Sequence, residues 1–477
     1  MEQKEFIQKV IAQKKDILLA ASDQIYDFAE LAFEEVRSAA LLEEILQQEG
    51  FTVETGLADI PTAFSGTWGT GSPVIGFLGE YDALDGLSQK AGCWVHTPVK
   101  EGAPGHGCGH CLLGSAALGA AIAVKEYLQQ NNEKGTVICF GCPAEEGAGS
   151  KQFMARDGIF DVCDYVFTWH PAMTNDVSAN STTAIMGANF SFRGKAAHAG
   201  GSPWLGRSAL DAAELMNVGC NYLHEHMKDG QRVHYAYGDA GGTAPNVVPA
   251  YARVKYEVRA RTVKECQELF ERVTKVAEGA ALMTETQMEC QITMAFSDFT
   301  NNPVLAKVAS DTLTELGAPE WSEEDYALAR AFLNSYEPLQ LSGIKESLKE
   351  RFGSEKLETI LQMPLHDSVI PYDPAKGIPV GGSSDVGDVS YAVPTCEIHV
   401  ATQCLGNIGH TWQNAGQSAS PLGRKGLLRA AEAMALSALR MRDPQLITEA
   451  KKATLARNGG KYVCPLPADV KPPIGTY

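Results

Sequence analysis

Short, uniformly apolar runs that alternate with helix-like segments constrain the fold of this 477-residue chain more than any other feature. Three of them, residues 73–79, 136–141 and 164–169, lack the apolar–polar alternation of a strand with one face in water. Longer segments with helical periodicity, including 23–49 and 112–130, lie before and between them. Strands buried on both faces and joined by helices are typical of a mostly parallel sheet covered by helices. We therefore predict an α/β catalytic domain of this kind.

Chemically reactive side chains follow each of the three runs. In chain order they are Glu80 and Asp82, then Glu145 and Glu146, and finally His170. In open parallel sheets, ligands bind beyond the carboxyl ends of the strands. The sequence therefore predicts that these five side chains converge on one functional site.

A second unit interrupts this domain. Its predicted order is strand, helix, strand, strand, helix, strand, at 184–193, 207–226, 232–238, 250–259, 264–283 and 287–296. This is the order of a ferredoxin-like α+β domain. We place the inserted domain at 185–297 and the catalytic domain at 1–184 and 298–477. In the latter, 319–380 is predicted to be a surface elaboration with two helices, and 422–442 a closing helix before a Pro-rich tail.

Charge and apolar patterning exclude several classes of partner. The 40 Lys and Arg residues against 58 Asp and Glu residues give a net charge of −18, which repels nucleic acid and anionic membranes. Residues 1–20 lack the apolar core of a secretion signal, and the longest apolar run, 112–124, is shorter than the ~20 residues that cross a bilayer. We expect a cytoplasmic protein with no nucleic-acid or membrane partner, whose twelve cysteines are reduced.

The loop GHGCGHC at 105–111 carries the strongest chemical signal. Cys108 and His110 are residue types that bind zinc and related metals, and the glycines let the backbone fold tightly around one point. A zinc ribbon is an alternative, because Cys108/Cys111 and Cys139/Cys142 both have CxxC spacing. The gap between the two pairs is longer than is usual for a ribbon. We therefore favour a different set of partners for Cys108.

The adjacent carboxylates supply those partners. Glu145 and Glu146 follow a buried strand, where two like charges are unfavourable unless a cation neutralises them. With a metal present, one carboxylate can be a ligand and the other a base for the attacking water. His170 and His410 are ambiguous individually, but together with Cys108 they suit a metallohydrolase with one or two divalent ions. Cysteine favours Zn²⁺, while the carboxylates accept Zn²⁺ or Mn²⁺.

The stretches GHGCGH, PAEEGAGSK, TWHP and GKAAHAG together resemble the aminoacylase/carboxypeptidase type of two-domain metallopeptidases, in the amidohydrolase branch with a cysteine in its metal loop. The resemblance covers nearly the whole chain. It implies two divalent ions per chain, bridged by Cys108, with Glu145 as the general base. The remaining ligands that it implies are His110, Glu146, His170 and His410.

The inserted domain resembles the lid and dimerisation domain of that family. The resemblance implies that His198 reaches the site of a neighbouring subunit and polarises the scissile carbonyl. It also implies substrate contacts from Asn246, with Arg259 as a candidate for the substrate carboxylate and Ser384 as a residue that shapes the pocket. We expect a homodimer through the lid, or a heteromer with a related subunit.

One motif departs from the wider family. Its first strand carries H-x-D, whose His is a ligand, whereas this chain has Glu80-Tyr81-Asp82. We therefore expect Cys108 to replace that ligand and Asp82 to orient another ligand in support of catalysis.

The implied reaction is hydrolysis of the amide bond of an N-acyl amino acid, with N-aroyl glutamates such as aminobenzoyl-glutamate favoured. A dipeptidase, an N-acyl-amino-acid deacylase, or a subunit active only within a heteromer are the alternatives.

Overall fold

A six-stranded sheet forms the centre of the computed structural model, which describes residues 2–475. Its order is β1-β2-β4-β3-β5-β10, and β4, β3, β5 and β10 run parallel, whereas β1 and β2 pair antiparallel at one edge. The predicted mostly parallel sheet is thus confirmed. The strand bounds are β1 Thr52–Thr55, β2 Phe64–Thr70, β3 Val74–Gly79, β4 Gly135–Gly141, β5 Tyr165–Ala172 and β10 Thr395–Ala401.

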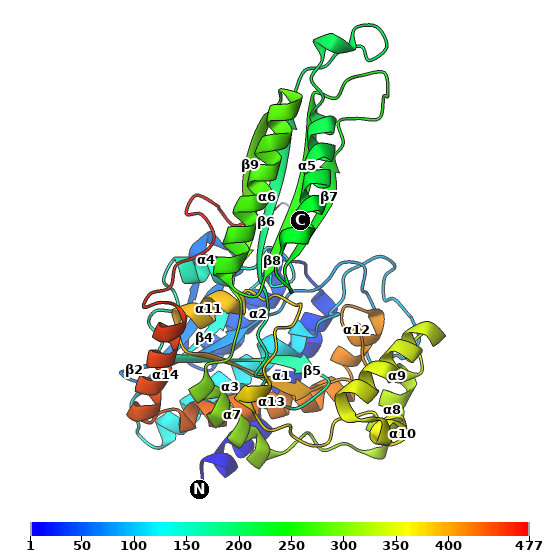
Figure 1. The fold of residues 1–477 in the computed structure, drawn as a ribbon. Helices are drawn as coiled ribbons and strands as arrows, with labels where there is room; N and C mark the ends of the chain where they lie inside the picture. Colours follow the sequence, from blue (N-terminus) through cyan, green and yellow to red (C-terminus); the bar gives the residue numbers. More distant parts are fainter. Residues whose placement is uncertain (1, 476–477) are drawn as a thin grey trace.

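Helices cover both faces of this sheet. On one face, α3 (His110–Gln130) and α13 (Pro421–Arg440) lie against the strands, with α1 (Gln3–Phe28) packed across both helices and α7 (Pro303–Leu316) beside β10 (Figure 1). Their buried side chains form one large apolar core. On the other face, α4 (Lys151–Arg156) and α11 (Val386–Ala392) pack together.

Helix α3 is apolar enough and long enough to cross a membrane by composition alone. However, 89% of the most hydropathic part of this helix is buried inside the protein. Its Gly114 also lies so close to the carbonyl of Glu80 that a Cβ atom would sit 2.7 Å from that oxygen. α3 is therefore a core helix packed against the catalytic sheet. Its close contact with the sheet fixes the position of its first residue, His110, at the strand ends.

The second sheet forms an elongated arm that projects from the central sheet (Figure 1). Its order is β7-β8-β6-β9, all pairs are antiparallel, and α5 (Ala209–Leu223) and α6 (Val263–Thr284) cover one face. Alternate residues of β8 are buried under these helices, so its charged residues lie on the uncovered face. The strands are β6 Ala184–Arg193, β7 Arg232–Asp239, β8 Tyr251–Ala260 and β9 Gln287–Phe296.

The predicted single helix over 23–49 is wrong. The structure has two helices, α1 and α2 (Val36–Gln48), separated by a turn in which Ala29 (φ 44°) and Phe33 (φ 64°) are left-handed. Glu35 closes the turn: its buried carboxylate accepts hydrogen bonds from the Phe33 N–H and the Thr62 hydroxyl. Apolar periodicity continues across the turn, which is why the sequence pattern did not reveal the break.

The C-terminal half contains more helices than predicted. Residues 319–380 include three α-helices, α8 (Glu323–Leu333), α9 (Pro338–Phe352) and α10 (Leu357–Gln362), which share a small apolar core with Cys404 and Leu405. After α13 the chain forms a further helix, α14 (Pro444–Arg457), before the Pro-rich segment. The 319–380 segment therefore packs beneath the loop that leads to His410.

Candidate metal centre and active site

The loop before α3 brings Cys108 and His110 to the strand ends. Gly109 has φ 88° and precedes the first helical residue, His110, so a residue with a side chain would be strained there. Gly105 is needed for close approach, because a Cβ atom would lie 2.0 Å from the carbonyl oxygen of Leu87. The glycines that the sequence singled out therefore shape the loop as expected.

Asp82 orients the fully buried His110. The Nδ1 of His110 lies 2.8 Å from one carboxylate oxygen of Asp82, and an Nδ1–H that donates to it leaves Nε2 with its lone pair available. The second oxygen of Asp82 accepts a hydrogen bond from the Glu146 backbone N–H at 2.8 Å. One carboxylate thus contacts two of the predicted ligands.

His170 is arranged in the same way. Its Nδ1 lies 2.8 Å from the Pro171 carbonyl oxygen, so an Nδ1–H donates to that oxygen and Nε2 points to Cys108, 3.4 Å from Sγ. Burial lowers the pKa of His170, which favours the neutral imidazole that metal binding requires. Potential ligand atoms of Cys108, His110 and His170 lie within 4.8 Å of one another.

Cys108 also belongs to a second group, with Glu146 and His410, that satisfies the same 4.8 Å criterion. His410 reaches this position through a left-handed backbone (φ 56°), and its N–H donates to the Gly107 carbonyl at 3.1 Å. Its Nε2 lies 3.3 Å from Glu146. Burial opposes ionisation of Glu146, but the interactions with His410 and His110 outweigh it and lower the pKa of Glu146 to about 2.

The chemistry of these two groups fits divalent metal ions. A thiolate, three imidazoles and a carboxylate are a donor set that zinc-type ions prefer. His110 Nε2 and Glu146 Oε1 are buried without a hydrogen bond, an arrangement that is unfavourable in a protein interior unless another group completes it. Because Cys108 belongs to both groups, its sulfur would be available to an ion in either group.

Glu145 lies beside these groups. Its carboxylate forms a third cluster, again within 4.8 Å, with Glu80 and His110. Burial, followed by the charges of Glu80 and Glu146, raises the pKa of Glu145 well above its usual range. Such a carboxyl group holds a proton more readily than an exposed one, as a general acid–base group requires.

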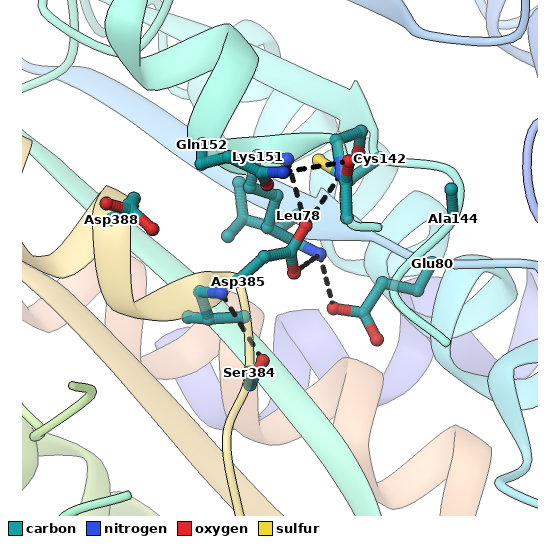
Figure 2. Close-up of polar contacts among 12 residues, drawn as sticks. Leu78, Glu80, Cys142, Ala144, Lys151, Gln152, Ser384, Asp385 and Asp388 are labelled. Carbon is teal, nitrogen blue, oxygen red and sulfur yellow. Dashed lines mark hydrogen bonds and ion pairs between the residues drawn. The ribbon is translucent and has the colours of Figure 1, made fainter. Parts of the chain in front are cut away.

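A buried ion-pair network, shown in Figure 2, fixes Glu80. The Lys151 ammonium lies 2.7 Å from Glu80 Oε1 and 2.7 Å from Asp385 Oδ1, and all three side chains are at most 3% exposed. The other Asp385 oxygen accepts hydrogen bonds from the backbone N–H groups of Ser150 and Lys151. Lys151 thus gives the buried carboxylate of Glu80 a counter-charge within the protein.

Sequence reasoning missed this network. Lys151 belongs to PAEEGAGSK and Asp385 to SSDVGDVS, but 234 residues separate the two partners. The only feature of the sequence that could have indicated this ion-pair network was a lysine, Lys151, shortly after the adjacent carboxylates Glu145 and Glu146.

The predicted residues of the arm fall into two separate places. His198 and Asn246 lie in neighbouring loops, one after β6 and one before β8, where the Ala199 N–H donates to the Asn246 carbonyl. Arg259 lies near the other end of β8, opposite Ile185 near the start of β6. The ten residues of β6, at about 3.3 Å per residue, separate the two places by roughly 30 Å. One chain therefore does not bring His198 and Asn246 to Arg259.

Ser384 and its neighbour Ser383 make different contacts. The Ser384 hydroxyl accepts a hydrogen bond from the Val386 N–H (Figure 2), whereas the Ser383 hydroxyl accepts one from Arg259 at 3.0 Å. Of the two serines, Ser383 is therefore the one that contacts Arg259.

The zinc-ribbon alternative finds no support in residues 2–475. None of the potential metal groups found there includes Cys111, Cys139 or Cys142. All three thiols are buried, and burial raises the pKa of Cys111 and of Cys139 to about 12. These cysteines are packing residues of the core.

A mostly parallel sheet with potential Cys, His and Glu metal ligands at its strand ends, and a second sheet that projects as an arm, is consistent with a metal-dependent hydrolase. The comparison with known families gives the same class, since residues 76–334 match the model of peptidase family M20/M25/M40. The chain belongs to this family.

Comparisons with individual proteins support the same family. The chain is 42% identical to a subunit of the p-aminobenzoyl-glutamate hydrolase of Escherichia coli, over 98% of both chains. It is 28% identical to the Xaa-Arg dipeptidase of Mus musculus, over 90% of this chain and 86% of the relative. A crystal structure of a dinuclear metal-binding M20 peptidase from Bacillus subtilis has a TM-score of 0.56 at 18% identity, covering 92% of this chain and 99% of that one, so the two share a fold.

Proposed function

We propose that this chain hydrolyses the amide bond of N-aroyl amino acids, with aminobenzoyl-glutamate as the principal substrate. The observation that carries the proposal is the sharing of Cys108 between two ligand groups directly beside Glu145. The name of the relative that is 42% identical over 98% of both chains supports the choice of substrate.

We assign the metal ligands as Cys108, His110 and His170 for one ion and Cys108, Glu146 and His410 for the other. When bound, two Zn²⁺ or Mn²⁺ ions supply Lewis acidity that polarises the amide carbonyl and activates water. Glu145 accepts the proton of the attacking water and donates it to the leaving amine nitrogen. Asp82 keeps His110 and Glu146 in position for this step.

His198 acts on the scissile carbonyl of a neighbouring subunit. It is exposed, and its Nδ1 accepts hydrogen bonds from the Gly200 and Gly201 N–H groups at 3.2 and 3.0 Å. The proton is therefore on Nε2, where it can be donated to a carbonyl oxygen. Asn246 lies in the adjoining loop and contacts the same substrate, whereas Arg259 binds the substrate carboxylate from within the same chain.

A homodimer through the arm gives His198 access to a second site. β7 is an edge strand of the arm sheet, and unpaired strand edges are ready to pair with another chain. Apolar side chains of the adjacent α5 are exposed, with Val218 51% and Tyr222 77% accessible. The alternative is assembly with a related subunit instead of a second copy of this chain. Measurement of the molecular mass of the purified chain in solution distinguishes a homodimer from this alternative.

The test is a comparison of Glu145→Gln and Glu146→Gln in protein loaded with Zn²⁺ or Mn²⁺. Glu145→Gln should keep the metal content of the wild type but lose turnover of aminobenzoyl-glutamate by a factor of about 10²–10⁴, because it removes the proton acceptor. Glu146→Gln should lose metal as well as turnover. Metal analysis and chromatography of released aminobenzoate provide the two readouts.

Retained turnover in Glu145→Gln would contradict the assigned base. Xaa-Arg dipeptides are the matched alternative substrates, and faster cleavage of these by the wild type would replace the proposed substrate class with that of a dipeptidase.

A further inference from the structure

A cavity of about 330 Å³ lies between the loop of residues 405–408 and helix α9, which is at the edge of the catalytic domain (Figure 1). Its walls are mostly apolar side chains, those of Met173, Ile344, Leu348, Phe352, Leu405 and Ile408. None of the metal ligands that we assign lines the cavity, although the loop leads on to His410. The hydrolysis that we propose therefore does not account for this space.

Hydrogen bonds hold the loop wall of the cavity in place without a ligand. The Tyr336 hydroxyl accepts a hydrogen bond from the Ile408 N–H at 2.8 Å and donates one to the side-chain oxygen of Asn407 at 3.0 Å. The buried Gln417 donates to the same oxygen at 2.7 Å. The wall is thus formed before any ligand enters, as is usual for small-molecule sites.

Two glycines shape the cavity. Gly406 has φ 87°, and a Cβ atom there would lie 2.4 Å from Cγ2 of Ile344, so a glycine lets the loop approach α9 closely. Gly343 lies in the middle of α9, where a Cβ atom would meet no atom within 4 Å. Glycine is unfavourable in a helix interior, and no packing contact at Gly343 requires it. Its effect is to leave the exposed side of the cavity unobstructed.

Arg351 is the only charged residue among the described residues that line the cavity. Its side chain is 44% exposed, and one N–H donates to the Thr174 hydroxyl at 2.9 Å. Within residues 2–475 its only ion-pair partner is Asp176, at 4.0 Å, and Asp176 lies closer to His399, at 2.9 Å. Other N–H groups of the guanidinium therefore remain available to an anion at the edge of the cavity.

We propose that the cavity is a second ligand site, separate from the metal centre, and that it binds a small aromatic monocarboxylate. The carboxylate pairs with Arg351, because a guanidinium group donates two parallel hydrogen bonds to a carboxylate. The ring lies against the apolar walls, where the Met173 sulfur and the Phe352 ring make favourable contacts with aromatic groups. A cavity of about 150 Å³ holds benzene, so this one, about twice as large, accommodates a substituted ring. A single cation in the lining favours one carboxylate over two.

The test is calorimetric binding of 4-aminobenzoate and its neutral isostere 4-aminobenzamide to the chelator-treated full-length protein. The acid should bind one to one, and at least about 10-fold more tightly than the amide, which cannot form charge-assisted bonds to Arg351. Arg351→Gln should weaken binding of the acid by about 10- to 100-fold and change binding of the amide by less than about threefold. Gly343→Leu, which fills the cavity, should weaken binding of both by about 10-fold or more. Gly279→Leu in α6, where a Cβ atom also meets nothing within 4 Å, is the matched control and should change neither.

Equal affinity for the acid and the amide would overturn the inference, as would binding of the acid that neither Arg351→Gln nor Gly343→Leu weakens. Absence of saturable binding at millimolar acid would overturn it too. Binding that appears only after metal loading and is lost in Cys108→Ser would place the acid at the metal centre, with the same consequence. If Gly343→Leu fails to fold, the result for Arg351→Gln still decides the question. Because the assay is free of metal, it does not depend on the proposed hydrolysis: a protein that binds the acid but cleaves no amide would keep this site and lose that function.

Discussion

Substitution of Lys151 by Met tests how the catalytic sheet tolerates its buried charges. The Lys151 side chain is 0% exposed, and its ammonium group lies 2.7 Å from both Glu80 and Asp385. Methionine has a similar length but no charge, so Lys151→Met leaves two carboxylates in the interior without their counter-charge. Breaking a buried ion pair by removing one partner costs about 3–5 kcal/mol.

The structure places the expected loss within that range. Glu80 keeps a second polar neighbour, the Nε2 of His110 at 3.3 Å, whereas Asp385 keeps only backbone N–H donors from residues 150 and 151. We therefore expect the free energy of unfolding to fall by about 4 kcal/mol, with most of the loss arising at Asp385. The double variant Lys151→Met/Asp385→Asn should recover about half of it, because Asn retains an acceptor for the backbone N–H groups but carries no charge.

Urea unfolding of chelator-treated protein measures these differences without a contribution from metal binding. Tryptophan fluorescence is a suitable probe, because Trp169 is fully buried in β5 beside His170. A Lys151→Met variant within about 1 kcal/mol of the wild type would refute the reasoning, as would a double variant no more stable than the single one. If the single variant fails to fold, the folded state of the double variant still decides the question.

Two further predictions concern a buried acid and the shared cysteine. Burial raises the pKa of Asp388 to about 7, despite hydrogen bonds from Ser297 and Tyr462. The stabilisation by protonated Asp388 is therefore fully present below about pH 4 and is lost as the pH rises through 7. Asp388→Asn should flatten this decline of the unfolding free energy in urea titrations between pH 4 and 8, and an unchanged pH dependence in the variant would contradict the prediction. Cys108→Ser should reduce the metal content at both positions and lower the thermal midpoint of the metal-loaded protein. Cys142→Ser should leave the metal content unchanged. Equal loss of metal in the two variants would instead favour the zinc ribbon.

The parts of the site that could be predicted from sequence are those governed by the geometry of parallel strands. Glu80, Asp82, Glu145 and Glu146 follow their strands, and the rule that parallel strands end at one edge of the sheet was enough to bring them together. His170 lies within β5 rather than after it, but near the same edge. Glycines around Cys108 indicated a tight loop, which the structure shows.

Features that depend on contacts between distant segments could not be predicted. Lys151 and Asp385 meet across 234 residues, and neither is marked by a local pattern. The break between α1 and α2 depends on tertiary hydrogen bonds to Glu35 from Thr62 and from the Ala144 N–H. The separation of Asn246 from Arg259 depends on the length of the arm, since the two residues are only 13 positions apart in the sequence.

The two ligand groups around Cys108 differ in their access to water. His410, in the group with Glu146, has a side chain that is 57% exposed, whereas His110, in the other group, is fully buried behind Asp82. On the proposed ligand assignment, an ion bound by Cys108, Glu146 and His410 would therefore lie nearer to solvent than an ion bound by Cys108, His110 and His170. The two positions would then differ in how readily they exchange metal with the surrounding solution.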